Sequence, residues 1–136
     1  MPISYTISSE DRLIRAVATG VISAPDLHRL IDSLLADPDL KPGLRGLYDA
    51  SIAEPDITIL QLAEVAGKVR ELLKRGLGRI ALVAQSQATY RVSKTFTVLA
   101  KAIGIDVDVF TTLADAEEWL DLPNGSSDPS ERLLRP

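Results

Sequence analysis

The chain has 136 residues, about the length of one domain, and 46% of them are hydrophobic but only 4% aromatic, so aliphatic side chains must fill a single core. It contains no cysteine and one histidine, His28, which excludes a disulfide framework, a thiolate nucleophile and a multi-histidine metal site. The formal net charge of -4 argues against general binding to nucleic acid.

The N-terminal part predicts a β-hairpin followed by a helix. Apolar and polar residues alternate over residues 3–8 and 13–18, on either side of a polar turn, which is the pattern of two antiparallel strands. Ser23 is a good N-cap for a helix whose apolar positions repeat at three and four residues until Asp37 and Pro38 end it.

The remaining chain alternates strands and helices. Strands are expected at residues 44–50, 79–84 and 106–111, and helices between Thr58 and Gly76, at residues 90–103 and at residues 113–120. Residues 51–57 are interpreted as a polar turn that leaves the sheet. The order β-β-α-β-α-β-α-β-α predicts an α/β fold: a mixed sheet, parallel in its later strands, with helices packed on both faces.

The two ends of the chain indicate its organisation and location. No apolar stretch approaches the roughly 20 residues of a membrane-spanning helix, and the start lacks the basic and apolar regions of a secretion signal. We therefore expect a cytoplasmic protein that does not span a membrane. Residues 1–122 are expected to form one domain, and the Pro-, Gly- and Ser-containing stretch 123–136 is expected to be a flexible tail.

Polar side chains at the predicted strand ends are the candidate site. In open α/β sheets, ligands bind outside the carboxyl ends of the parallel strands, so side chains such as Ser51, Ser86 and Thr112 are expected on one rim. The candidate ligand- or partner-binding residues are Asp49, Ser51, Thr58, Gln85, Ser86, Tyr90, Arg91 and Lys94. A structural alternative stands beside this hypothesis: the hydroxyl residues are helix caps worth about 1 kcal/mol each, and Asp49 bonds the amides of a turn.

Basic residues are concentrated in one part of the chain. Residues 66–101 contain eight basic residues and one acid, Glu71, whereas the rest contains seven basic and eighteen acidic residues. Such a positive sector can steer an anionic small molecule or lipid headgroup, although runs of charge are more often solvated helix faces.

The usual catalytic signatures are absent from the sequence. It contains no phosphate-binding glycine loop, no G-x-S-x-G and no metal-spaced His/Glu pair. We therefore expect no enzymatic activity, no cofactor and no metal.

The element order and three stretches of sequence resemble the SpoIIAA-like fold. The stretches are "PISYTI", "LIRAVATGVISAPDLHRLIDSLLADPDLKPGLRGLYDAS" and "DVFTTLADAEEWL", and the resemblance covers about residues 2–122. This group holds the STAS domains (sulfate transporter and anti-sigma factor antagonist) and is similar to the CRAL-TRIO lipid-binding domains. Within it, the chain most resembles the small stand-alone bacterial STAS-like proteins of unassigned function.

The resemblance also implies a phosphoacceptor. In anti-sigma factor antagonists, a kinase phosphorylates a serine in a D-S-S-G-like turn at the start of the helix after the third strand, and this controls partner binding. The matching stretch here is "AEPDITIL", in which Thr58 stands nearest to that serine and Asp56 nearest to the acid before it, but the S-S-G is missing.

The sequence is compatible with two functions. The first is a non-enzymatic regulatory or protein-interaction module that binds a protein partner through the surface around Ser51, Thr58 and the helix that follows. The alternative is a small-molecule or lipid carrier that holds an anionic ligand at the strand ends. An uncovered edge strand would favour a homodimer, but no residue pattern specifies one.

Overall fold

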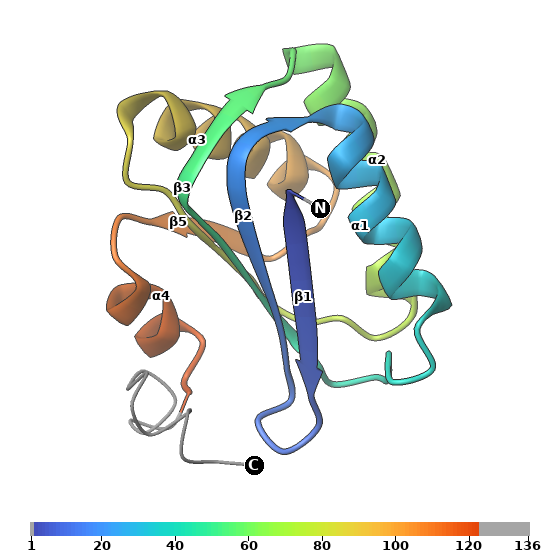
Figure 1. Cartoon of the computed structure of the whole chain (residues 1–136). Coiled ribbons are helices and arrows are strands. Elements are labelled where there is room, and N and C mark those ends of the chain that lie inside the picture. Colours follow the sequence, from blue (N-terminus) through green and yellow to red (C-terminus); the bar gives the residue numbers. More distant parts are fainter. Residues whose placement is uncertain (1, 123–136) are drawn as a thin grey trace.

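The computed structural model describes residues 2–122, which alternate strands and helices in the expected order (Figure 1). The elements are β1 (Ile3–Ser8), β2 (Leu13–Ser23), α1 (Ala24–Ala36), β3 (Arg45–Asp56), α2 (Ile59–Lys74), β4 (Ile80–Val83), α3 (Gln87–Ala102), β5 (Val107–Phe110) and α4 (Leu113–Trp119). The predicted tail, residues 123–136, lies outside the described part.

The strands form one five-stranded sheet in the order β1-β2-β3-β4-β5. β1 is antiparallel to β2, and every other neighbouring pair is parallel. The predicted mixed sheet, parallel in its later strands, is therefore confirmed. The last strand, β5, lies at an edge of the sheet.

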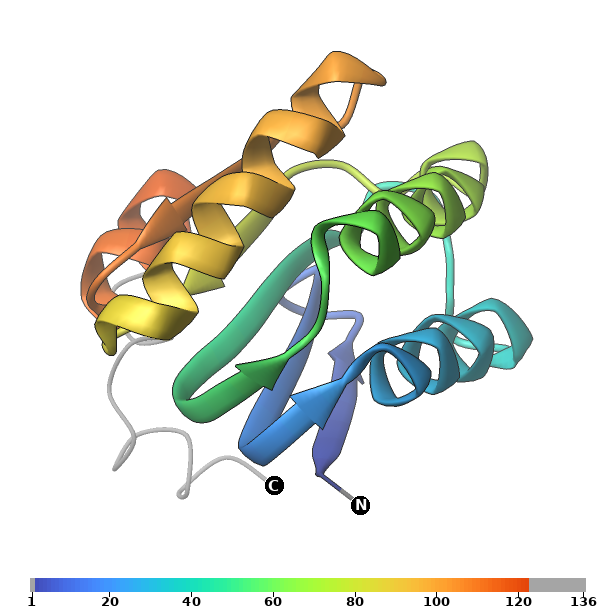
Figure 2. The same cartoon turned by 90° about the horizontal axis from the view of Figure 1, so that it is seen from above.

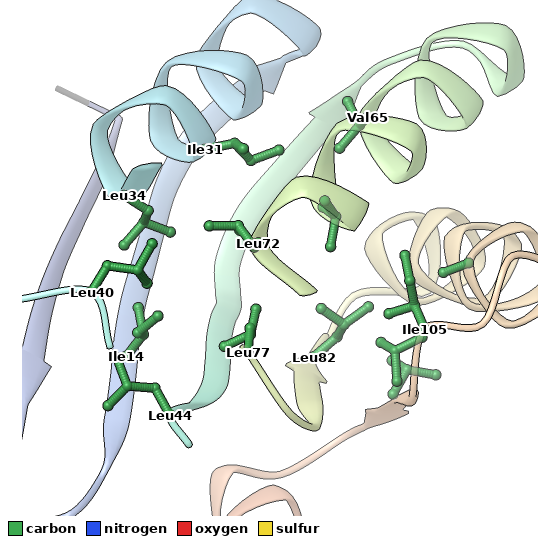
Figure 3. Close-up of a cluster of buried hydrophobic side chains, with 14 of the residues drawn as sticks. Ile14, Ile31, Leu34, Leu40, Leu44, Val65, Leu72, Leu77, Leu82 and Ile105 are labelled. Carbon is green, nitrogen blue, oxygen red and sulfur yellow. The ribbon is translucent and has the colours of Figure 1, made fainter. Parts of the chain in front are cut away.

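Helices cover both faces of the sheet: α1, α2 and α3 lie on one side and α4 lies on the other (Figures 1 and 2). We call the face covered by α1, α2 and α3 the front face and the other the back face. On the front face, the side chains of these helices pack with strand residues such as Ile14 and Leu82 in the larger apolar cluster (Figure 3). On the back face, Ala116 and Leu120 of α4 pack against strand residues such as Leu47. The alternation of side chains along each strand supplies both clusters from one sheet.

The expectation that the third strand ends at Ala50 is wrong. β3 continues to Asp56 because β2 also continues to Ser23, and the two strands pair along this length. β4 pairs only with residues 46–49 of β3. Residues 50–56, which we call the β3 extension, therefore have a strand neighbour on one side only.

A β-bulge marks the start of the β3 extension. Ala50 and Ser51 together face one residue of β2, Ala18, so the register shifts at this point. After the bulge, Ala53 is buried and Ile52 is exposed. The bulge thus keeps Ala53 directed toward the helices of the front face.

The helix starts agree with the expected caps, which are Ser23, Thr58, Ser86 and Thr112. α3 begins at Gln87, three residues earlier than predicted, because Ser86 caps it directly. These caps fix where each helix leaves the sheet, and so they position the polar groups at the strand ends.

Candidate functional site

The middle of β3, at Asp49, lies beside the ends of β4 and β5. Asp49 is in register with Val83, and Val83 is in register with Phe110. The residues that follow these strand ends, including Ser86 and Thr112, therefore lie along one rim of the sheet. This is the rim expected from the sequence.

Asp49 and Ser51 bond each other at the bulge. The Ser51 amide donates to Asp49 Oδ1 at 3.0 Å, and the Ser51 hydroxyl donates to the same oxygen. Both polar groups are thus engaged in shaping the strand, as the structural alternative for Asp49 describes.

Ser86 and Thr89 tie the start of α3 to the β3 extension. Ser86 Oγ accepts from the Thr89 amide at 3.1 Å and donates to Thr89 Oγ1 at 2.8 Å. The buried Thr89 hydroxyl in turn donates to the Ala53 carbonyl at 2.8 Å. Since no strand within residues 2–122 pairs with this edge of the β3 extension, the Thr89 bond replaces part of a missing ladder.

Thr58 lies apart from the rim residues. β3 continues for five residues beyond Ser51, a distance of about 17 Å at the usual strand rise. Thr58 is exposed, and Thr58 Oγ1 accepts from the Gln61 amide at 3.2 Å while the Gln61 side chain accepts from the Thr58 amide at 2.9 Å. The neighbouring Ile59 and Leu60 are 67% and 73% exposed.

The basic candidates lie on the outside of α3. Arg91 and Lys94 are exposed, and Lys94 Nζ lies 5.9 Å from the centre of the Tyr90 ring. Gln85 is also exposed, just before the helix. The inward positions of α3 are occupied by other residues, among them Ser93. Arg91 and Lys94 therefore face solvent.

Nearby acids neutralise part of the positive sector. The ion pairs are Lys68 Nζ with Asp32 at 2.7 Å, Lys74 Nζ with Glu71 at 3.4 Å and Arg79 Nε with Asp106 at 3.0 Å. The Arg79 guanidinium also lies 4.6 Å from the centre of the Trp119 ring. The basic residues are thus spread over several elements and serve partly in local contacts.

An apolar cavity of about 160 Å³ lies between the sheet and helices α1, α2 and α3. It was not predicted from the sequence. Its lining includes Ile22, Leu30, Tyr48, Val65, Val92 and Phe96. Among the described residues that line it, Glu54 is the only charged one, and the Glu54 residue is exposed. Figure 2 shows the three helices arranged over this face of the sheet.

Three hydroxyl residues, Tyr48, Thr89 and Ser93, interrupt the apolar lining. Ser93 is 9% exposed, and its hydroxyl makes no hydrogen bond with any residue of the described part. Burial, and secondarily the negative charge of Asp26, raise the pKa of the Tyr48 hydroxyl. Tyr48 therefore stays a neutral phenol at physiological pH.

Small side chains create the space. Ala16, Ala50 and Ala53 line the cavity from the strands, and Ser93 lines it from α3. Larger residues at these positions would fill the volume between sheet and helices. Small residues at inward positions on both facing elements were the signal in the sequence, although it becomes informative only when the facing elements are known.

Residues 2–122 contain neither a metal-binding cluster nor a membrane-spanning helix. This part of the chain has no group of three or more His, Cys, Asp or Glu side chains placed to hold a metal ion. None of its helices combines the length and apolarity needed to cross a membrane.

The strand order and the distribution of helices define a SpoIIAA-like α/β fold, so the predicted fold class is confirmed. An uncharacterised protein from the DUF3478 family with a SpoIIAA-like fold, from Shewanella loihica PV-4, is similar in structure, with a TM-score of 0.52 over 87% of this chain and 91% of that chain. The two sequences are 21% identical, so the likeness concerns the fold. No family model and no curated protein matches the chain.

Proposed function

We propose that this chain is a non-enzymatic STAS-like module that binds a small apolar molecule in the cavity between the sheet and α1–α3. The observation that carries the proposal is the cavity itself, about 160 Å³ with a lining that is almost entirely aliphatic and aromatic. A dry cavity of about 150 Å³ lined by such side chains is large enough to hold benzene. This observation favours the carrier hypothesis over the interaction hypothesis.

The expected affinity follows from the size of the cavity. Burial of one methylene contributes about 0.8 kcal/mol, so a six-carbon occupant gains roughly 5 kcal/mol. This corresponds to a dissociation constant of about 0.2 mM. Such weak binding suits a sensor or carrier of an abundant metabolite-sized compound.

Titration with toluene, followed by ¹H–¹⁵N NMR spectra of the full chain, tests the proposal. We expect saturable shifts of the amides that line the cavity, such as those of Val65 and Val92, and little change at α4. If toluene produces no saturable shift up to its solubility limit, the proposed function is wrong.

A second candidate is contact with a protein partner through the start of α2. It rests on the exposed Thr58 beside the exposed Ile59 and Leu60, a combination of a modifiable hydroxyl with uncovered apolar surface. A phosphate on Thr58 would lie at the positive end of the α2 dipole. Phosphorylation would thus add charge to this surface without an electrostatic penalty from the helix.

Substitution of Thr58 tests the second candidate. Thr58→Ala and Thr58→Glu are each expected to change the capture of a protein partner, with the fold retained. Ser4→Ala, at an exposed position of β1, is the control. If neither Thr58 variant changes partner capture, this surface is not the contact.

A further inference from the structure

We propose that the cavity selects an uncharged ligand with one hydrogen-bonding group, such as an alcohol of about six carbons, and that the Ser93 hydroxyl binds this group. The inference rests on the proposed function, because it concerns the ligand of the same cavity. It departs from the anionic ligand expected from the sequence.

The lack of cationic side chains among the described lining residues supports the selection of an uncharged ligand. No Lys, Arg or His is among the described residues that line it, so nothing there neutralises a carboxylate or a phosphate. Burying an ionised group without a partner is strongly unfavourable. Arg91 and Lys94 face solvent on the outside of α3, whereas Val92, Ser93 and Phe96 line the cavity. A ligand in the cavity therefore does not meet the basic residues of this helix.

The hydroxyl residues on the inner face of α3 support Ser93 as the residue that binds the polar group of the ligand. Thr89, Ser93 and Thr97 follow each other at intervals of one helical turn, and all three are buried. Thr89 donates to the Ala53 carbonyl and Thr97 donates to the Ser93 carbonyl, each at 2.8 Å. Only the Ser93 hydroxyl of these three has no such partner in the described part of the chain, and Ser93 lines the cavity.

The Ser93 hydroxyl keeps some accessible surface, so a ligand in the cavity can reach it and add a hydrogen bond in mostly apolar surroundings. The apolar side chains of the lining contact a ligand but do not fix its orientation, because apolar contacts are not directional. The Ser93 hydroxyl would therefore orient a ligand by its polar end, while the alkyl or aromatic part packs between Leu30, Val65 and Phe96. A molecule of about six carbons matches a cavity of about 160 Å³.

Three probes of similar size test the inference on the full chain at pH 7: 1-hexanol, hexanoate and toluene, each titrated by ¹H–¹⁵N NMR. We expect 1-hexanol to bind at least about tenfold more tightly than hexanoate, because the carboxylate has no partner in the cavity. Equal affinities for 1-hexanol and hexanoate would overturn the selection of an uncharged ligand, while the proposed function would stand. Failure of all three probes to bind would overturn the proposed function itself.

The variant Ser93→Ala tests the anchoring hydroxyl. It is expected to weaken 1-hexanol binding by about three- to tenfold, the usual effect of one lost hydrogen bond, and to leave toluene binding unchanged. Ser4→Ala on β1 is the matched control and is expected to change neither. Unchanged 1-hexanol binding in Ser93→Ala would show that Ser93 is not the anchor. An equal loss for both probes would show that Ser93 only shapes the cavity.

Discussion

Asp26 is a single residue on which the start of α1 depends. Its Oδ2 accepts from the Ser23 amide and from the Ser23 hydroxyl, both at 2.9 Å, and its carboxylate also pairs with Arg29. The bond from the Ser23 amide is the main cause that lowers the pKa of Asp26, and the Ser23 hydroxyl and Arg29 act in the same direction. This residue thus couples the end of β2 to the helix that follows.

The lowered pKa makes the stability contribution of Asp26 dependent on pH. Because the pKa in the folded state is lower than in the unfolded state, the contribution is present above about pH 4 and is lost as the pH falls through the folded-state value. Asp26→Asn is therefore expected to lower the melting temperature at pH 7, with the difference from the natural chain shrinking below about pH 4. Thermal unfolding followed by circular dichroism from pH 7 to pH 3 measures this, and a difference that stays constant over the range would contradict it.

At the scale of elements, the β3 extension and α3 form a contact that replaces strand pairing. The Thr89 hydroxyl bonds the Ala53 carbonyl on the edge that β4 does not cover. The same contact lies beside the cavity, which Thr89 and Ala53 both line. Holding α3 on this edge therefore helps to define one wall of the cavity.

Removal of the hydrogen bond from Thr89 to the Ala53 carbonyl is expected to loosen the β3 extension and the start of α3. Thr89→Val keeps the shape of the side chain but loses the donor, and we expect a cost of about 1–2 kcal/mol. Amide hydrogen exchange should become faster in residues 50–56 and in the first turn of α3. Thr95→Val removes an exposed bond within α3, from Thr95 Oγ1 to the Arg91 carbonyl, and serves as the control with a smaller effect. Equal changes in the two variants would argue against a special role for Thr89.

The order of the elements and the caps were predictable from sequence because both are local. Apolar periodicity predicted the helices, and hydroxyl residues such as Thr58 and Ser86 indicated where the helices begin. The β3 extension was not predictable, since Ser51, Glu54 and Pro55 read as a turn and only pairing with the distant β2 makes them a strand. The cavity was missed for a related reason: it exists only where small residues of β2, β3 and α3 meet.

At the scale of the whole molecule, the two faces of the sheet are packed differently. The back face is tight: Leu47, Val83, Ala116 and Leu120 are 1% exposed or less. The front face contains the cavity under three helices. An interior normally leaves few voids larger than a water molecule, so the empty volume on the front face costs stability. That cost is consistent with a space kept for a ligand.

Two neighbouring alanines of β2 test this difference. Ala16 lines the cavity, whereas Ala18 is fully buried and does not. Ala16→Val is expected to stabilise the fold by up to about 1 kcal/mol, since filling roughly 40 Å³ gains about 24 cal/mol per Å³, and to weaken toluene binding. Ala18→Val is expected to destabilise it by about 1–3 kcal/mol through overpacking. Urea unfolding of both variants measures this, and destabilisation by Ala16→Val would mean that the volume is not available.

The bulge at Ala50 and Ser51 has a consequence for how the length of this chain can vary. The extra residue is absorbed at the bulge, because Val17 pairs with Asp49 before it and Thr19 pairs with Ile52 after it. Deletion of Ser51 would leave Ala50 alone opposite Ala18 and restore a regular ladder, in which Ile52 still faces outward and Ala53 still faces the helices. Natural loss of one residue at this point is therefore compatible with an intact cavity, whereas a one-residue insertion elsewhere in the β3 extension, without a bulge of its own, would turn Ala53 to solvent.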